Sequence, residues 1–137
     1  GLWSTALDAD ELLVAVDVPV WSGRCGFAIE ELARRHGDFA IAGAAVAVEV
    51  GDDDRIARCG IGLIGLGPTP LRASAAEGEV VGRAVAEVEP GEIGRLATAS
   101  LEEVPSDLHG PATYRKRVGA ATVARALERA IAEAPGG

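Results

Sequence analysis

The sequence predicts an α+β domain in which a small antiparallel sheet of three to four strands packs on three helices. Segments with alternating apolar residues occupy the first half of the chain. Segments with apolar residues three and four positions apart occupy the second half. Strands followed by helices, rather than alternating with them, are typical of this class. The length of 137 residues, 48% of them hydrophobic, suits one core rather than two, so residues 1–137 are expected to form one domain.

Strands are expected in the first half of the chain. The even-numbered residues from 12 to 18 are all Leu or Val, so residues 11–18 are expected to form a strand that ends at Pro19. Residues 27–33 fit a strand, although their Glu-Glu-Leu run suits a helix equally well. Residues 44–50 alternate clearly, and residues 55–66 resume an extended pattern after a short Gly-Asp turn. This pair of segments predicts an antiparallel hairpin.

The second of these segments contains the spacing G-x-G-x-x-G, which dinucleotide-binding loops use. Such a loop works because its third glycine opens a helix whose N-terminal amides receive the pyrophosphate. Here Gly65 is followed by Leu-Gly-Pro-Thr-Pro, and two prolines prevent a helix from starting at that point. We therefore expect no nucleotide in this loop. The glycines are expected to allow a bulge or a close approach of another backbone.

Three helices are expected in the second half. Residues 74–81 form a short one with Ser74 as its N-cap, and residues 90–103 place their apolar side chains along one stripe. The longest starts near Pro111, with Ser106 or Asp107 as candidate cap. Its basic residues from Arg115 to Arg129 are expected on a solvated face. Arg115, Thr122, Arg125 and Arg129 all fall outside the apolar stripe.

The net charge narrows the possible partners, and the cysteine pattern indicates neither a zinc site nor a disulfide. The formal net charge of −8 repels phosphate backbones and anionic lipids, so neither nucleic acid nor a membrane surface is an expected partner. No run of about 18 to 20 apolar residues and no basic leader is found, which makes a cytoplasmic location the default expectation. Cys25 and Cys59 show no zinc or disulfide pattern, so both are expected to be small buried residues.

No self-contained catalytic or metal site is expected from spacing. Ser106, Asp107 and His109 hold the residue types of a hydrolytic triad, but such a triad needs side chains that converge from separate elements. His36 has no suitable metal-ligand partner four residues away. The three aspartates at 52–54 lack the later ligands of a calcium loop and are expected to form a solvated turn.

Four stretches, in order, resemble the C-terminal domain of the flavin-binding medium subunit of the molybdenum hydroxylases. This group includes aerobic carbon monoxide dehydrogenase and xanthine dehydrogenase. The resemblance covers nearly the whole chain. The stretches are GLWSTALDADELLVAVDVP at 1–19, ARRHGDFA at 33–40, GPTPLRA at 67–73 and DLHGPATYR at 107–115.

The resemblance implies a small antiparallel sheet on three helices, in agreement with the pattern above. It also implies that an N-terminal domain, absent from this chain, holds the FAD pyrophosphate, so that the chain is a fragment or a free-standing relative. The implied function is electron transfer through FAD. The implied partners are an iron–sulfur small subunit and a molybdopterin large subunit. Together they would supply the electrons, and the large subunit would choose the substrate.

The resemblance further implies that Leu13, Asp38 and Phe39 contact the flavin ring, with Phe39 lying against the isoalloxazine. From the residues alone, Phe39 fits a core aromatic equally well, and Asp38 fits a cap of the segment that follows. One departure concerns charge. Relatives often place a Lys shortly before the basic pair, whereas this chain has Glu30 and Glu31, and carboxylates beside an anionic reduced flavin would disfavour the usual arrangement.

The sequence is also compatible with two other functions. The fold could serve as a non-enzymatic module that docks a partner or a second copy of the chain, giving a homodimer. It could also be a small enzyme that reuses the scaffold, for which His36, Asp38 and His109 would be the residues to test.

Overall fold

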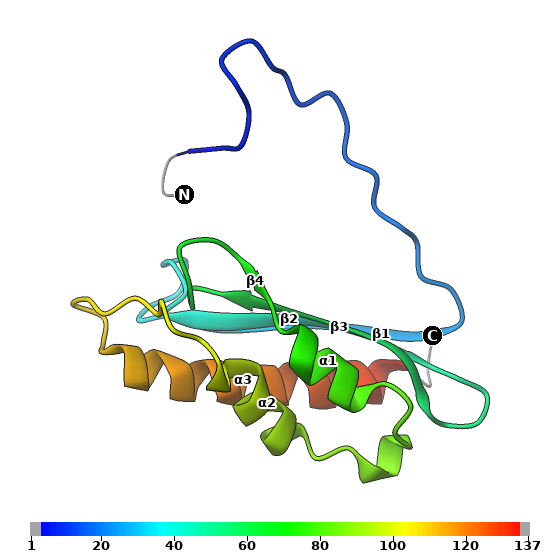
Figure 1. Cartoon of the computed structure of the whole chain (residues 1–137). Coiled ribbons are helices and arrows are strands. Elements are labelled where there is room, and N and C mark those ends of the chain that lie inside the picture. The colour runs from blue at the N-terminus through cyan, green and yellow to red at the C-terminus, as the bar shows by residue number, and fades with distance from the viewer. Residues whose placement is uncertain (1–3, 135–137) are drawn as a thin grey trace.

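The computed structural model describes residues 4–134 and shows one sheet covered on one face by helices (Figure 1). The sheet is antiparallel, with the strand order β1-β2-β3-β4. The strands are β1 (Arg24–Leu32), β2 (Ala42–Val50), β3 (Ile56–Ile64) and the short β4 (Leu71–Arg72). The helices are α1 (Ser74–Val80), α2 (Pro90–Ala99) and α3 (Ala112–Glu133), with a 3₁₀ turn at Val85–Glu87. The predicted fold class is confirmed.

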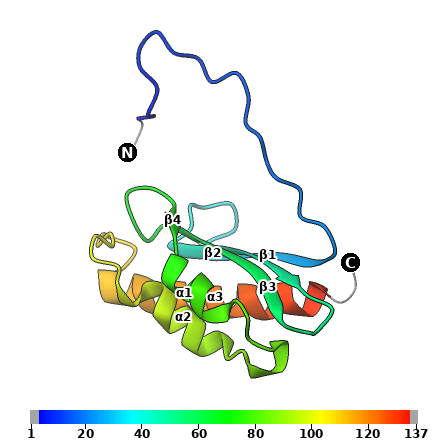
Figure 2. The same ribbon diagram turned by 45° about the vertical axis from the view of Figure 1, so that its right-hand side comes forward.

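The core lies between the sheet and the helices. On β2, the even-numbered residues from Ala42 to Val50 are all buried toward the helices, and the opposite residues of β3, such as Cys59, Ile61 and Leu63, are buried with them. The predicted hairpin between these strands is confirmed. The odd-numbered residues of β2 point to the other face, which carries no helix in either view (Figures 1 and 2).

Two glycines let the layers approach closely. A Cβ atom added to Gly26 on β1 would lie 1.8 Å from the Ala130 carbonyl oxygen of α3. A Cβ atom added to Gly94 on α2 would lie 2.1 Å from the Ala120 carbonyl oxygen, also on α3. Backbones at these crossings therefore touch without an intervening side chain, which places α3 directly against the sheet edge and against α2.

The strand predicted at residues 11–18 is wrong. The segment is extended but pairs with no strand among residues 4–134, and Leu12 and Val14 are more than four-fifths exposed. It would need a free sheet edge, and the outer edge of β1 is occupied by side chains of α3. Glu133 accepts a hydrogen bond from the Phe27 backbone N–H at 2.7 Å, and Arg129 donates one to the Ile29 carbonyl at 3.5 Å.

The structure also settles the secondary structure of residues 27–33 and the ends of two helices. Residues 27–33 belong to a strand and not to a helix. Ser74 is the first helical residue instead of the N-cap of α1, and no side chain caps that helix. Helix α2 ends at Ala99 instead of residue 103, and a longer helix would place two glutamates, Glu102 and Glu103, at its negative C-terminal end.

The cysteines are both free. Cys59 is buried as expected, whereas Cys25 is only half-buried because it lies on the sheet face that the helices leave uncovered. In the described part of the chain, no helix combines the length and the apolar character that crossing a bilayer requires.

Candidate functional site

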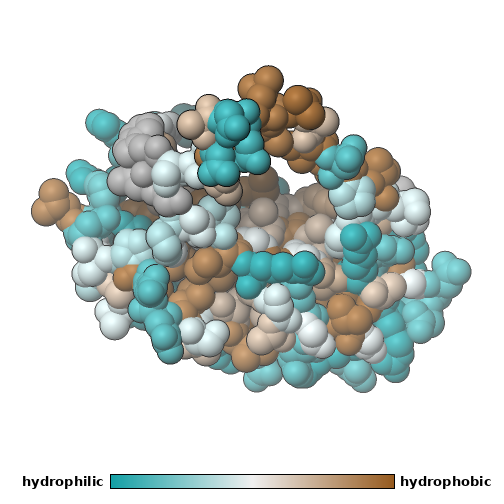
Figure 3. All heavy atoms as spheres, turned by 45° about the horizontal axis from the view of Figure 1, so that its top comes forward, coloured by the Kyte–Doolittle hydropathy of each residue, from teal (hydrophilic) through white to brown (hydrophobic). Residues whose placement is uncertain are grey.

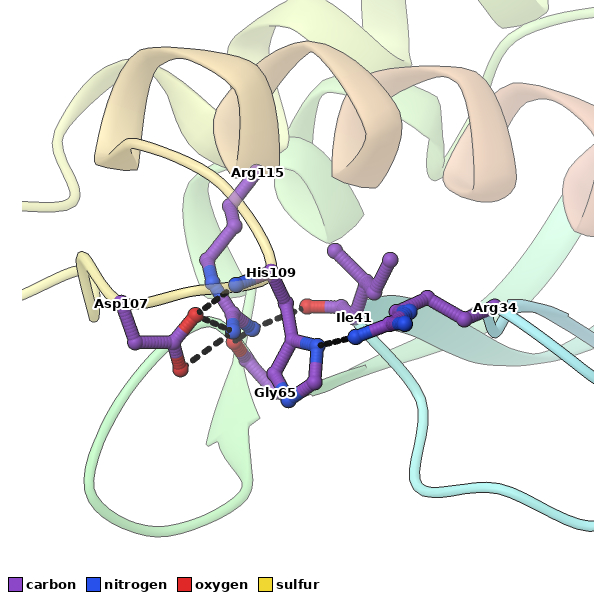
Figure 4. A network of polar contacts seen from close by, with 6 residues as sticks. All are labelled: Arg34, Ile41, Gly65, Asp107, His109 and Arg115. Carbon is purple, nitrogen blue, oxygen red and sulfur yellow. Dashed lines mark hydrogen bonds and ion pairs between the residues drawn. The ribbon is translucent and has the colours of Figure 1, made fainter.

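Three connecting segments meet at one end of the sheet. They are the β1–β2 loop at 33–41, the start of the β3–β4 connection at Gly65, and the turn at 107–110 that precedes α3. Figure 4 shows Arg115, in the first turns of α3, reaching toward all three. The loop that contains Asp38 and Phe39 is one of the three, so this end of the sheet is the candidate site.

Arg115 is the residue that holds the three segments together. Only 5% of it is exposed. Its Nη1 atom donates to the Ile41 carbonyl at 2.6 Å and to the Gly65 carbonyl at 3.4 Å, and Nη2 donates to both carboxylate oxygens of Asp107 at 2.8 and 2.7 Å. Its Nε atom is buried and finds no hydrogen-bond acceptor among residues 4–134. The planar guanidinium fork suits this task because it can direct several donors at once.

The expectation that Arg115 lies on a solvated helix face is therefore wrong, because the residue is buried. Thr122, which falls outside the predicted apolar stripe, is buried as well. Thr122 donates its hydroxyl to the Gly119 carbonyl within the helix at 2.9 Å, which satisfies the side chain without solvent. A helical wheel alone does not predict that Arg115 is buried. The sequence signal that could have indicated it is Asp107, because both members of the ion pair lie in the motif DLHGPATYR, eight residues apart.

Asp107 stabilises the turn at 107–110 and does not cap α3. Its Oδ1 atom accepts a hydrogen bond from the His109 backbone N–H at 2.8 Å. Hydrogen bonds from Arg115, and then that backbone bond, hold the pKa of the Asp107 carboxyl below its ordinary value. The helix starts at Ala112, within one residue of the expected position, and Pro111 takes the N-cap position without a side-chain cap, so Ser106 and Asp107 lie too far upstream to cap it.

The histidine of this turn faces the β1–β2 loop. Nδ1 of His109 lies 3.4 Å from Nη1 of Arg34, so the unprotonated nitrogen can accept a hydrogen bond from the guanidinium. A hollow of about 470 Å³ lies here, lined by Arg34, Arg35, Asp38 and His109. His109 contacts Arg34 and not a serine, and Asp107 binds Arg115, so Ser106, Asp107 and His109 do not form a triad.

Asp38 and Phe39 occupy the tip of the β1–β2 loop. Asp38 accepts a hydrogen bond from the Phe39 backbone N–H at 3.1 Å and lies 3.4 Å from Nε of Arg35, so it organises the loop locally. No helix follows it to be capped. Phe39 is 94% exposed, which rules out the interpretation of Phe39 as a core aromatic. Leu13, the third predicted contact residue, is 63% exposed and lies in the extended segment before β1.

The glycine-rich segment behaves as its prolines predict. No helix starts at Gly65, and the next helix begins at Ser74. Gly65 has φ +71°, and a Cβ atom there would lie 3.0 Å from the carbonyl oxygens of Ala40 and Ile41, so the expected close backbone approach is found at this glycine. The Gly65 carbonyl accepts a hydrogen bond from Nη1 of Arg115.

Comparison with known proteins decides the family. The sequence model described as "CO dehydrogenase flavoprotein C-terminal domain" matches residues 27–130. The chain belongs to this family. The resemblance seen in the sequence is thereby confirmed, and the motifs at 33–40, 67–73 and 107–115 all fall within the matched region.

Two named relatives are similar to this chain along nearly its whole length. Caffeine dehydrogenase subunit beta of Pseudomonas sp. (strain CBB1) is 38% identical over 95% of this chain and 43% of its own length. The carbon monoxide dehydrogenase medium chain of Afipia carboxidovorans is 37% identical over 98% of this chain and 46% of its own length. The present chain thus spans less than half the length of these relatives.

Solved structures agree with the family assignment. Reconstituted CO dehydrogenase from Oligotropha carboxidovorans superposes with a TM-score of 0.88 at 36% identity, covering 98% of this chain and 46% of that one. Quinoline 2-oxidoreductase from Pseudomonas putida 86 superposes with a TM-score of 0.85 at 30% identity, covering 96% and 45%. At these identities the shared fold reflects membership of the same family.

The residues of this family member fit one part of a flavin and not another. Phe39 offers a bare aromatic ring on a loop that Arg115 anchors through the Ile41 carbonyl, and an exposed ring can stack on a flat heterocycle. Within residues 4–134, the glycine loop opens no helix that could receive a pyrophosphate. The exposed Phe39 ring is thus compatible with a flat ring system, whereas the glycine loop lacks the helix start that a pyrophosphate site uses.

The charge departure at Glu30 is compensated. Glu30 points to the helix side of β1 and forms an ion pair with Arg129 of α3. Its carboxylate is thus neutralised within the domain, which reduces its expected repulsion of an anionic ring. Glu31 points to the opposite side of the strand and is exposed.

The residues suggested for a reused enzyme scaffold are not gathered in one place. Asp38 and His109 line the same hollow. His36 lines a different one with Glu31, Arg35 and Gly37. In the described range 4–134 no three His, Cys, Asp or Glu side chains are placed to bind a metal ion together.

Proposed function

We propose that this chain is the C-terminal part of an electron-transfer flavoprotein subunit in a molybdenum-containing dehydrogenase, and that Leu13, Asp38 and Phe39 contact its flavin ring. The observation that carries the proposal is the family match over residues 27–130, together with a bare aromatic at the tip of an anchored loop. Bound FAD would supply the redox chemistry, taking electrons from iron–sulfur and molybdenum centres and passing them to an acceptor.

The contribution of the chain itself would be positional. Arg115 holds the Ile41 carbonyl, two residues after Phe39, and Asp38 bonds the Phe39 backbone N–H. These contacts limit the motion of the loop, so Phe39 can be presented to a ring without a large ordering cost on binding. A loop held in this way also keeps water from one face of the ring. Stacking and water exclusion are the means by which a protein tunes a cofactor that does the chemistry.

The partners proposed are an iron–sulfur small subunit and a molybdopterin large subunit. Relatives named "subunit beta" and "medium chain" are components of larger assemblies. A similar solved structure, 36% identical with a TM-score of 0.87, is titled Cu,Mo-CO dehydrogenase, which supports a molybdenum partner for this chain. The substrate would be chosen in the molybdenum subunit.

The test is the absorbance of the protein encoded by the whole open reading frame that contains residues 1–137. We expect a yellow protein with an absorbance maximum at about 450 nm, which is bleached by reduction, and copurification with subunits that contain iron–sulfur and molybdenum centres. A whole protein that is colourless, and that takes up no added FAD, would contradict the proposal. It would instead favour the docking module.

A further inference from the structure

A charged hollow lies between the β1–β2 loop and the turn at 107–110. It is lined by Arg34, Arg35 and Asp38 of the loop and by His109 of the turn. The surface beside it is chemically different. The uncovered sheet face holds an apolar hollow of about 600 Å³, and Figure 3 shows apolar residues gathered on this side of the molecule. The charged side chains of the loop and the turn therefore find their protein partners in one another.

The loop that carries Phe39 is firmly fixed at its second end. There the Ile41 backbone N–H donates to the Leu32 carbonyl at 2.7 Å. The Ile41 carbonyl in turn accepts a hydrogen bond from the buried Arg115 at 2.6 Å. The chain is thus held on both sides of its backbone two residues after Phe39.

The first half of the loop, residues 33–38, is held in a different way. Its backbone forms a local hydrogen bond from the Asp38 N–H to the Arg35 carbonyl at 3.2 Å. Among residues 4–134, its one hydrogen bond to another segment joins Arg34 to His109. We call residues 33–38 the loop arm. The position of the loop arm relative to the rest of the domain therefore depends on the contact between Arg34 and His109.

His109 is presented from a fixed backbone. Asp107 and Gly110 exchange backbone hydrogen bonds at 3.3 and 3.0 Å, which closes the turn. The Asp107 carboxylate accepts the His109 backbone N–H at 2.8 Å and is itself held by Arg115. The histidine ring is thus a well-positioned support for a side chain that reaches it from the loop arm (Figure 4).

The proton on this ring decides whether Arg34 is bound. Nη1 of Arg34 lies 3.4 Å from Nδ1 of His109. A guanidinium group can only donate, so Nδ1 must be unprotonated to accept its hydrogen bond. Histidine is the side chain that ordinarily gains a proton between pH 5 and 8. A protonated ring offers no acceptor and places a positive charge against the guanidinium.

The surrounding charges do not compensate for such a proton. The charged groups around the ring come from the loop arm, the turn and α3: Arg34, Arg35, Asp38, Asp107 and Arg115. Three of these groups are guanidiniums and two are carboxylates. Asp107 is bound to Arg115, and Asp38 lies 3.4 Å from Nε of Arg35, so both carboxylates already have a cationic partner. Protonation of His109 should therefore drive Arg34 away.

We propose that His109 is a positioning residue for the β1–β2 loop: its neutral ring holds the loop arm through Arg34, and its protonation releases that arm. The consequence for the flavin rests on the function proposed above, in which Phe39 contacts the flavin ring. With the loop arm released, Phe39 is held from the Ile41 side alone. The flavin contact should therefore weaken as the pH falls.

Hydrogen exchange of the loop amides tests the proposal. It is measured by mass spectrometry in the whole open-reading-frame product that contains residues 1–137. Exchange of the peptide with Asp38 and Phe39, corrected for the intrinsic effect of pH, is compared at about pH 8 and about pH 5. We expect the corrected rate to be about two- to tenfold higher at the acid pH, because one hydrogen bond that restrains the loop arm is lost.

Two substitutions at position 109 separate the proton from the contact. His109→Asn keeps a neutral side-chain oxygen as acceptor and does not titrate, so exchange should stay slow at both pH values. His109→Leu removes the acceptor, so exchange should be fast at both. His36→Asn is the matched control. His36 lies in the loop arm but lines a different hollow, with Glu31 and Arg35, so this variant should keep the response of the wild type.

A wild-type rate that changes no more with pH than the rate of His109→Asn would overturn the proposal. Loss of the pH response in His36→Asn would also overturn it, because the titrating group would then be His36. Circular dichroism at each pH shows whether a variant is folded. If His109→Leu does not fold, the wild type and His109→Asn still decide the result.

Flavin absorbance of the same samples keeps the two proposals apart. A colourless protein whose loop exchange still responds to pH through His109 would contradict electron transfer through FAD and support the positioning role. A yellow protein without that response would do the reverse.

Discussion

Arg115 and Asp107 form an ion pair in which one arginine nitrogen, Nη2, donates to both carboxylate oxygens at 2.8 and 2.7 Å. The arginine is buried and the aspartate side chain is about half exposed, at 45%. The other terminal nitrogen of Arg115 donates to the Ile41 and Gly65 carbonyls. One helix residue thus fixes the turn before α3, the end of the loop that carries Phe39, and the glycine that follows β3.

Removal of this arginine should destabilise the domain. We expect Arg115→Met to lower the free energy of unfolding by about 2–3 kcal/mol, because it leaves the Ile41 carbonyl without its donor and Asp107 without its partner. Urea denaturation followed by circular dichroism measures the loss. Arg125→Met, at an exposed position of the same helix, is the control and should change the value by less than about 0.5 kcal/mol. Equal losses in both variants would show that Arg115 has no special role.

The same pair should appear in the pH dependence of stability. Arg115 lowers the folded-state pKa of Asp107, and the unfolded carboxyl titrates near 3.8, so the stabilisation is present above that pH and is lost as the pH falls through the folded value. We expect Asp107→Asn to be less stable than the wild type at neutral pH, with the difference narrowing below pH 3.8. Thermal unfolding over an acid pH series checks this, and a constant gap would contradict it.

Two helical glycines should respond oppositely to alanine. A Cβ atom on Gly94 would collide with the Ala120 carbonyl oxygen of α3, whereas a Cβ atom on Gly78 in α1 meets nothing within 4 Å. Gly78→Ala should stabilise the domain by about 0.5–1 kcal/mol through helix propensity. Gly94→Ala should destabilise it, because α2 must move away from α3. Melting temperatures of the two variants decide the matter, and a gain at Gly94 would mean that the helices do not touch there.

The two thiols should differ in reactivity. Burial, with a smaller contribution from Glu77, raises the pKa of the Cys59 thiol to about 12, and the thiolate is the reactive form. In the folded chain at pH 8 we expect the half-buried Cys25 to react with a disulfide reagent, while Cys59 reacts only after urea is added. Cys25→Ser should then show no fast-reacting thiol. Rapid modification of both cysteines in the native chain would show that the β2–β3 core opens readily.

Phe39 should matter for the cofactor and not for the fold. Because its ring is 94% exposed, Phe39→Ala should change the free energy of unfolding by less than about 0.5 kcal/mol. In the whole flavoprotein we expect the same change to weaken FAD retention by about 0.5–1.5 kcal/mol, the usual contribution of an aromatic stack. The ratio of flavin to protein after dialysis measures this, with Val81→Ala as the exposed apolar control. Unchanged retention would remove Phe39 from the proposed site.

Much of the fold follows from local pattern. Alternation in residues 44–50 and 55–66 identified the central hairpin, and Pro68 and Pro70 correctly excluded a helix after Gly65. Helix starts near residues 74, 90 and 111 were also correct to within a residue. These signals are local, because pleat and helix periods place side chains on faces regardless of what lies opposite.

The candidate site was harder to predict because it depends on contacts between distant segments. Position 38–39 came from the resemblance, and its flavin contact stays a prediction. The apolar stripe of α3 predicts a solvated Arg115, yet the partners of this residue lie 74, 50 and 8 residues away along the chain. A helical wheel places charged residues on the solvent side, because charges usually face water. Arg115 departs from that rule because carbonyls and a carboxylate satisfy its buried guanidinium.

The sequence by itself determined the α+β class, the central strand pairing, the approximate helix positions and the family to which the chain belongs. Tertiary structure alone decided which residues meet: the burial of Arg115, the ion pair that neutralises Glu30, and the lack of a partner strand for residues 11–18 among residues 4–134. Periodicity is encoded over a few neighbouring residues, whereas burial of a charge or pairing of a strand depends on which distant groups the fold brings within hydrogen-bonding reach.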